Sequence, residues 1–158
     1  MLPRAVAVIC ERAVYTRPMA NSMYIAAPRA EFSLAEVQAM VAAVFVDLQL
    51  PPPSIRVEPY PNKAMRGEYF FLEGAGPDDF CWADVDERAM PEVSEDPSRP
   101  FLISVTTRGD WRFGGAVALA FCRLGGGCVF NDSGQLDGSP TFDESTLYRA
   151  LLNCRFQA

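Results

Sequence analysis

The chain has 158 residues, of which 49% are hydrophobic and 22% are charged, and its formal net charge at pH 7 is −6. This length and composition are those of one folded domain with a single core, so we expect residues 1–158 to form one domain and exclude wholesale disorder. The acidic balance argues against nucleic acid as a partner, because phosphate contacts need a basic face, and it allows a basic protein partner.

The first half of the chain predicts strands around one helix. Residues 5–10 are a short apolar run typical of a buried strand, and residues 23–27 are a candidate second strand. Ser33 and Glu36 have the spacing of a capping box, in which each side chain accepts a hydrogen bond from the other residue's main-chain N–H. Apolar residues then recur at helical spacing to about residue 49, where three prolines end the helix.

Further strands are expected before residue 90. Residues 54–60 alternate between apolar and polar side chains, which is typical of a half-buried strand. A turn at residues 61–63 precedes a strand over 68–73, and residues 79–86 contain a candidate edge strand. Residues 90–100 are rich in proline and acids, and we expect them to form an exposed loop.

The second half of the chain predicts a strand, a helix and another strand. Residues 101–107 are rich in β-branched side chains and indicate a strand. Asp110 is then a candidate N-cap for a helix over 111–124, which the following glycine run stops. Residues 128–130 indicate a further short strand.

A second capping-box pattern, formed by Thr141 and Glu144, predicts a C-terminal helix that runs to about residue 153. The central strands of the expected order are joined by hairpin-length connections. This favours the α+β class, with a mostly antiparallel sheet, two main helices packed on one face, and the C-terminal helix added. The order is compatible with a ferredoxin-like core carrying additions.

The residues that common catalytic and cofactor sites need are missing from the sequence. There is no histidine, which excludes Ser–His–Asp and Cys–His nucleophiles and histidine metal sites. The only lysine, Lys63, does not belong to a phosphate-binding loop. The five cysteines are scattered without a C-x-x-C pair, which indicates reduced and mostly buried thiols. We therefore expect no enzyme, no cofactor and no metal; the alternative is a carboxylate-based enzyme or small-ligand binder.

Nothing in the sequence indicates a membrane partner or export. No apolar run approaches the roughly 20 residues that a membrane span requires. The N-terminal apolar run ends at Glu11, which is short of the core of a signal peptide. We therefore expect a cytoplasmic protein.

An acidic segment covers residues 78–96. It holds eight of the 20 acids of the chain, and Arg88 is its only base, so its formal charge is −7. Two interpretations are open: a solvated loop that keeps the protein soluble, or a steered interface with an aromatic anchor. Trp111 is a second candidate anchor, which either joins an interface or closes the core at a helix start. The candidate partner-binding residues are Asp78, Asp79, Trp82, Asp84, Asp86, Glu87, Glu92, Glu95 and Trp111.

In size and character, this small, acidic, histidine-free α+β chain resembles the immunity proteins with which bacteria neutralise cognate toxins. The resemblance implies an inhibitor that occludes the active site of a toxin, such as a nuclease with a basic cleft, and it carries over no family residue. An inhibitor that mimics nucleic acid is an alternative, which requires acids in a regularly spaced stripe. A homodimer formed through an exposed sheet edge is also allowed.

Overall fold

The computed structural model describes residues 21–60, 67–86, 97–132 and 134–154. The strand expected at residues 5–10, the turn at 61–63 and most of the loop at 90–100 lie outside these ranges. The described strands are β1 (Asn21–Ala27), β2 (Ser54–Pro59), β3 (Glu68–Glu73), β4 (Phe80–Asp86), β5 (Phe101–Thr107), β6 (Val129–Asn131) and β7 (Thr141–Phe142). The described helices are α2 (Leu34–Asp47), α3 (Trp111–Gly125) and α4 (Glu144–Cys154).

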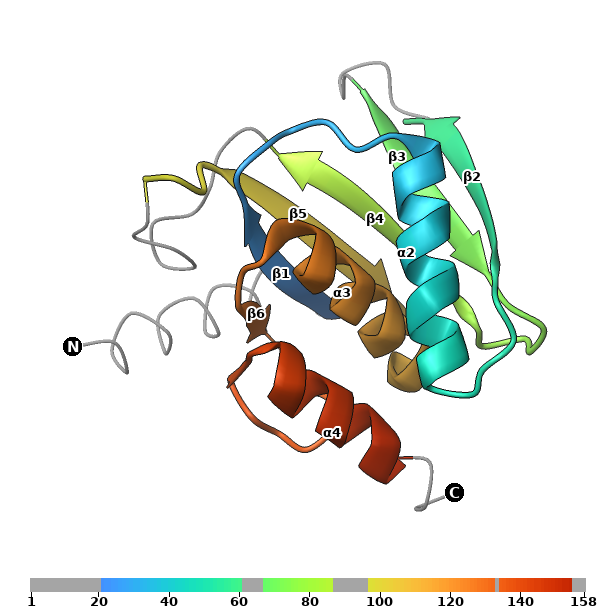
Figure 1. Cartoon of the computed structure of the whole chain (residues 1–158). Helices are drawn as coiled ribbons and strands as arrows, with labels where there is room; N and C mark the ends of the chain where they lie inside the picture. Colours follow the sequence, from blue (N-terminus) through green and yellow to red (C-terminus); the bar gives the residue numbers. More distant parts are fainter. Residues whose placement is uncertain (1–20, 61–66, 87–96, 133, 155–158) are drawn as a thin grey trace.

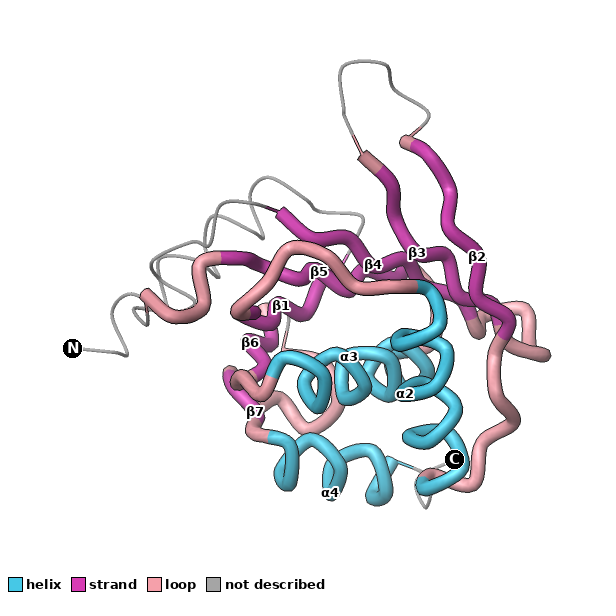
Figure 2. Tube along the Cα trace, turned by 45° about the horizontal axis from the view of Figure 1, so that its top comes forward, coloured by secondary structure: helices cyan, strands magenta, loops and turns pink. Residues whose placement is uncertain are grey.

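The described strands form one antiparallel sheet in the order β2-β3-β4-β5-β1-β6-β7. The three helices lie on the same face of this sheet, and the core fills the space between the two layers (Figures 1 and 2). This confirms the expected α+β class. The order β6-β1-β5, with a helix after β1 and another after β5, is that of a ferredoxin-like core whose central meander has four strands instead of two.

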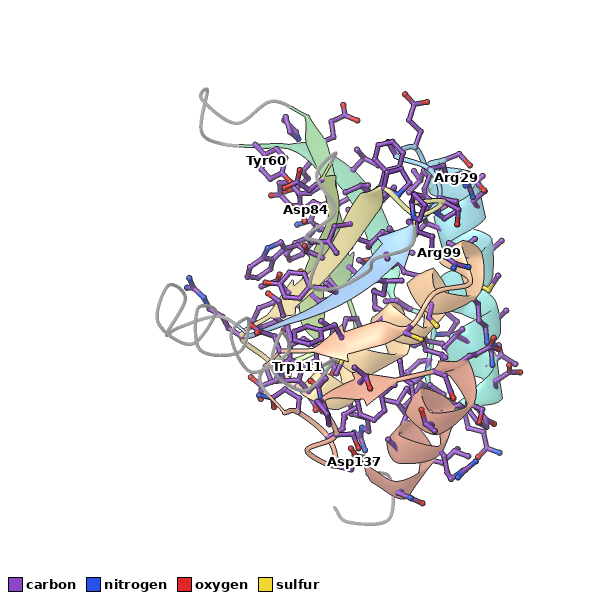
Figure 3. The ribbon with its side chains drawn as sticks, turned by 90° about the vertical axis from the view of Figure 1, so that its left-hand side faces the viewer. Arg29, Tyr60, Asp84, Arg99, Trp111 and Asp137 are labelled. Carbon is purple, nitrogen blue, oxygen red and sulfur yellow. The ribbon has the colours of Figure 1, made fainter. Side chains whose placement is uncertain are left out.

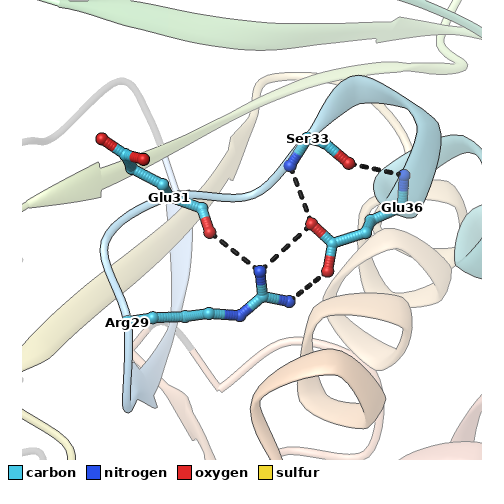
Figure 4. A network of polar contacts seen from close by, with 4 residues as sticks. All are labelled: Arg29, Glu31, Ser33 and Glu36. Atoms are coloured by element: carbon cyan, nitrogen blue, oxygen red, sulfur yellow. Dashed lines mark hydrogen bonds and ion pairs between the residues drawn. The ribbon is translucent and has the colours of Figure 1, made fainter.

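Helix α2 begins at the predicted capping box. The Glu36 N–H donates to Ser33 Oγ over 3.1 Å, and the Ser33 N–H donates to Glu36 Oε2 over 2.9 Å. Arg29 joins this network by an ion pair with Glu36 and a 3.0 Å bond to the Glu31 carbonyl (Figure 4). The hydrogen bond from Arg29 is the largest cause that lowers the pKa of Glu36 to about 2, and the two bonds with Ser33 add to it.

Helix α3 is the central helix of the layer. Its N-cap is Asp110, as predicted, and Gly126 ends it in the left-handed conformation, with a φ of 67°. The helix is buried on nearly every side because β5 lies beneath it, α2 packs on one flank and α4 on the other. A Cβ atom on Gly114 would lie 3.1 Å from Thr107 Cγ2, and one on Gly115 would lie 2.8 Å from Leu151 Cδ2. These two glycines therefore let the helix approach the sheet and α4 closely.

The prediction that Thr141 caps the C-terminal helix is wrong. Thr141 and Phe142 still belong to a strand, because they pair with Phe130 and Val129 of β6. The cap comes two residues later: the Thr146 N–H donates to Asp143 Oδ1, and the Asp143 N–H donates to Thr146 Oγ1. The spacing of a capping box thus occurs twice within six residues, and strand pairing with β6 decides which one is used.

The prediction of an edge strand within residues 79–86 is also wrong, since β4 lies between β3 and β5. Cys81 and Ala83 point into the core and are fully buried. The many acids around them suggested a solvated position, but the strand alternates, and its apolar side is covered by the helix layer. The solvated-loop interpretation of the acidic segment therefore fails for residues 80–86.

Candidate functional site

The acidic segment does not form a single surface in the described residues. Asp78 and Asp79 lie in the turn before β4 and support its geometry: the Asp78 carbonyl accepts the Asp110 N–H over 2.8 Å, and Asp79 Oδ2 accepts the Gly76 N–H over 3.1 Å. Asp84 and Asp86 lie toward the other end of the strand. The described acids of the segment are therefore two separate groups, and not the regular stripe that nucleic-acid mimicry requires.

Trp82, Asp84 and Asp86 share one side of β4. Successive side chains of a strand point to opposite faces, and Cys81 and Ala83 occupy the core side, so these three point to the face opposite α2, α3 and α4. Because none of the described helices lies there, we call it the helix-free face. In Figure 3 the side chain of Asp84 lies on this face, away from α2. Trp82 and Asp84 are half-buried, whereas Asp86 is exposed. Glu87, Glu92 and Glu95 lie outside the described residues.

Aromatic and charged side chains from β2 and β3 surround this position. Phe71 of β3 is the cross-strand partner of Trp82, and Tyr69 lies two residues before it on the same face. Tyr60 follows β2, and its ring centroid is 5.3 Å from that of Tyr69. We call the whole set the open-face cluster; its members are Arg56, Glu58, Tyr60, Tyr69, Phe71, Trp82 and Asp84.

Polar contacts hold the cluster in place. The Tyr60 hydroxyl donates to Asp84 Oδ2 (labelled in Figure 3), and the Tyr69 hydroxyl donates to Glu58 Oε2 over 2.8 Å. Arg56 forms an ion pair with Glu58 in the same strand, and its guanidinium carbon lies 4.4 Å from the centre of the Phe71 ring. The side chains of three neighbouring strands are thus oriented before any partner arrives.

These contacts also set the protonation states. Burial, followed by the bond to Asp84, raises the pKa of Tyr60 above its ordinary value, so its phenol stays protonated at neutral pH. The hydrogen bonds from Arg56 and then from Tyr69 lower the pKa of Glu58, which is therefore ionised. The cluster offers fixed hydrogen-bond donors, carboxylate acceptors and aromatic faces.

Only part of the helix-free face is accessible to solvent. Over β1, β5 and β6 most of its side chains are buried, although they lie outside the main core: Tyr24, Ala26, Leu102 and Phe130 are each less than 5% exposed, and Ser104 is half-buried. Over β2, β3 and β4, the side chains of the cluster are half-buried or exposed. The open-face cluster therefore occupies most of the accessible part of this face.

Trp111 does not lie on this surface. It is 7% exposed and packs in the core beneath the first turn of α3, where its ring lies against Gly114. Of the two interpretations of this residue, the structure favours closure of the core. Because the side chain is buried, it is not available as a partner anchor in the folded chain.

The described residues offer little to a small ligand. They form shallow depressions beside the C-terminal end of α2, where Leu50 and Arg112 line both, and Asp79 is the single carboxylate among the lining residues. Within the same ranges, no three Cys, Asp or Glu side chains gather as metal ligands. Burial raises the pKa of the Cys122 thiol to about 11, which disfavours the reactive thiolate. A carboxylate-based ligand site would need several acids around one pocket, whereas these two depressions contain Asp79 alone.

Sequence reasoning found Trp82 and Asp84 but missed the other members of the open-face cluster. The signal was present, because Arg56, Glu58 and Tyr60 alternate with apolar residues, as do Tyr69 and Phe71. What the sequence lacked was the pairing of β2 with β3 and of β3 with β4, which places these alternating sides next to one another.

Comparison with known proteins finds no family model, no curated protein and no solved structure that matches the chain. In the residues that the structure describes, none of the helices is long and apolar enough to cross a membrane.

Proposed function

We propose that this protein is a small acidic inhibitor that binds a cognate protein toxin through the open-face cluster. One observation carries the proposal: Trp82 lies half-buried on the helix-free face, and tyrosines, an arginine and carboxylates are fixed on its own strand, on β3, and on or just after β2. Tryptophan, tyrosine and arginine are the residues most enriched among those that dominate binding energy at protein interfaces.

The rigidity of the surface supports a binding role. The cluster stands on three hydrogen-bonded strands, and Tyr60, Tyr69 and Arg56 already hold the positions described above. A surface that is oriented before binding loses little side-chain entropy when a partner docks. This favours a preformed recognition face of the kind that a tight, specific inhibitor needs.

The charge of the surface indicates the chemistry of the partner. Asp84 and Asp86 place carboxylates on the same side of β4 as Trp82, and the chain as a whole carries a formal charge of −6. Such a surface fits a basic cleft, such as the nucleic-acid site of a nuclease toxin, and electrostatic attraction would speed the encounter. Blocking the cleft would then neutralise the toxin.

The experiment that tests the proposal is co-expression of the chain with the products of its neighbouring genes. We expect one neighbour to be a toxic effector that co-purifies with the chain as a stable stoichiometric complex and loses its toxicity. If no neighbouring product is toxic, or if a toxic product neither binds the chain nor is neutralised by it at low salt, the proposal is contradicted.

A further inference from the structure

Strand β2 is the end strand of the sheet that the described residues form, and its neighbour there is β3. The Tyr60 N–H donates to the Gly67 carbonyl, which immediately precedes β3, over 3.4 Å, so residue 60 directs its main chain toward the β3 side. In an antiparallel ladder this orientation alternates from residue to residue. The N–H and C=O groups of Ile55 and Val57, and the C=O of Pro59, therefore point outward from the sheet.

The surface next to this edge is unusually apolar. The large hydrophobic side chains that are exposed in the described part of the chain are Leu34, Val46 and Val57, with 36%, 65% and 37% exposure, and all three lie on α2 and β2. Helix α2 packs against β2 and extends beside it (Figure 1). A surface helix normally presents polar residues to water, but the exposed residues of α2 are mostly apolar: Leu34, Ala35, Ala39, Ala43 and Val46, beside Gln38 and Asp47. This is the composition of a helix face that another protein surface covers.

We propose that β2 pairs with β2 of a second copy of this chain, antiparallel and centred on Val57. A twofold axis perpendicular to the sheet at this point joins the two sheets edge to edge and keeps both α2 helices on the same side of the joined sheet. Reciprocal main-chain hydrogen bonds then form between Val57 and its symmetry mate. The Ile55 N–H of each copy donates to the Pro59 carbonyl of the other.

The charges of β2 are complementary to themselves in this register. The twofold axis passes through position 57, so each residue faces the one that lies equally far from Val57 on the other side. Arg56 of one copy therefore faces Glu58 of the other, and Glu58 of the first copy faces Arg56 of the second. Two opposite-charge pairs on the helix-free face thus accompany the Val57 contact on the helix face. A slip of the strand by one residue would break both pairs and turn side chains to the wrong face, so the register is specified.

Pro59 limits the pairing to this short segment. Proline has no N–H, so a partner strand gains no donor at this position. Charged residues and proline at a strand edge also oppose random aggregation. A partner strand must place an acid opposite Arg56 and a base opposite Glu58. A second copy of β2 provides both. This inference concerns the edge of the sheet and does not rest on the proposed function.

Sedimentation of the full chain over a range of concentrations tests the proposal. We expect a reversible dimer, and we expect Arg56→Glu and Glu58→Arg each to weaken it at least about tenfold, because each places like charges opposite one another twice. A mixture of the two variants should dimerise again, since the carboxylate introduced in one variant then faces the guanidinium introduced in the other. Arg108→Glu, the same charge change on an exposed residue after β5, is the matched control and should dimerise as the unchanged chain does.

A cross-link provides a second, independent readout. Paired residues at a hydrogen-bonded position have Cα atoms about 5.5 Å apart, which a disulfide can bridge. Val57→Cys should therefore form a covalent dimer under mild oxidation, whereas Val46→Cys, exposed on α2 but off the axis, should not. A chain that stays monomeric at every concentration overturns the proposal. So does a dimer that is insensitive to both charge reversals or that cross-links equally well through either cysteine.

Discussion

At the scale of single residues, the two tryptophans take opposite roles. Trp82 is half-buried on the helix-free face, whereas Trp111 is 7% exposed and belongs to the core. Both stand close to acids in the sequence, so composition does not distinguish them. What separates them is the element that carries each one: a strand turns alternate residues to an open face, and the first turn of α3 lies over the core.

This difference predicts opposite effects of substitution. Trp111→Ala should lower the free energy of unfolding by about 3–5 kcal/mol, because it removes a large core side chain. Trp111→Phe should cost much less, since it keeps a ring in place and removes the indole N–H, which has no hydrogen-bond partner among the described residues. Trp82→Ala should lower stability less than Trp111→Ala. Urea unfolding of the three variants measures these differences, and equal losses for both alanine variants would contradict the assignment of Trp111 to the core.

Glu36 predicts a specific dependence of stability on pH. Its folded pKa of about 2 lies below its ordinary value of 4.5. The folded state therefore binds a proton there less readily than the unfolded state, and the stabilisation is present above about pH 4.5 and is lost as the pH falls toward 2. Glu36→Gln should remove this part of the acid sensitivity and lower stability at neutral pH.

The measurement is thermal unfolding between neutral pH and pH 2, with Glu31→Gln as the matched control. Residue 31 is exposed, and Arg29 binds its main-chain carbonyl, which the substitution leaves in place. The control variant should follow the pH profile of the unchanged chain. If Glu36→Gln also follows that profile, the network around Arg29 does not stabilise the fold as described.

At the scale of elements, sequence patterns correctly predicted the features that depend on residues close together in the chain. The capping box of α2 and the N-cap of α3 join residues two or three positions apart, and both were predicted. The cap of α4 and the position of β4 in the sheet were predicted wrongly, because each depends on pairing with a strand distant in the sequence. Hydrophobic pattern indicates which side of a strand is buried, but it does not say which strand lies beside it.

The turn between β5 and α3 provides a test of packing between elements. A Cβ atom on Gly109 would lie 2.1 Å from the main-chain oxygen of Asp78, which cannot move without breaking its bond to the Asp110 N–H. A Cβ atom on Gly115 would meet the flexible end of Leu151. We expect Gly109→Ala to lower the free energy of unfolding by about 1–3 kcal/mol or more. Gly115→Ala should lower the free energy of unfolding less. Alanine favours the helix over glycine by about 1 kcal/mol, and the Leu151 side chain can move away from the added methyl group. Chemical denaturation of both variants checks this order, and the reverse order would contradict the contact at Asp78.

At the scale of the whole molecule, the sequence predicted the fold class and part of the candidate site. The alternation of each strand was readable, and Trp82 was identified as a candidate anchor, a role that stays a prediction. The open-face cluster was not predicted as a unit, because Tyr60 and Asp84 are 24 residues apart and meet only when β2, β3 and β4 lie side by side. Within the described residues, the same assembly leaves the outer edge of β2 without a neighbouring strand and leaves Leu34, Val46 and Val57 exposed beside it, which no local pattern indicates.

The sheet thus presents two surfaces with different properties. The open-face cluster combines aromatic rings with carboxylates, and we propose that it binds a basic partner, whereas we propose that the edge of β2 pairs with itself. Arg56 and Glu58 belong to both. Trp82 lies two strands away from that edge, so substitution there separates partner binding from dimerisation.

The most direct test of the account is the affinity of the Trp82→Ala variant for the toxin that the proposed function expects to co-purify with the chain, measured by calorimetric titration against the unchanged chain and an Arg108→Ala control. We predict that Trp82→Ala loses at least about 2 kcal/mol of binding free energy while remaining folded, and that Arg108→Ala binds as the unchanged chain does. Unchanged affinity of a folded Trp82→Ala variant would contradict the claim that the open-face cluster is the binding surface.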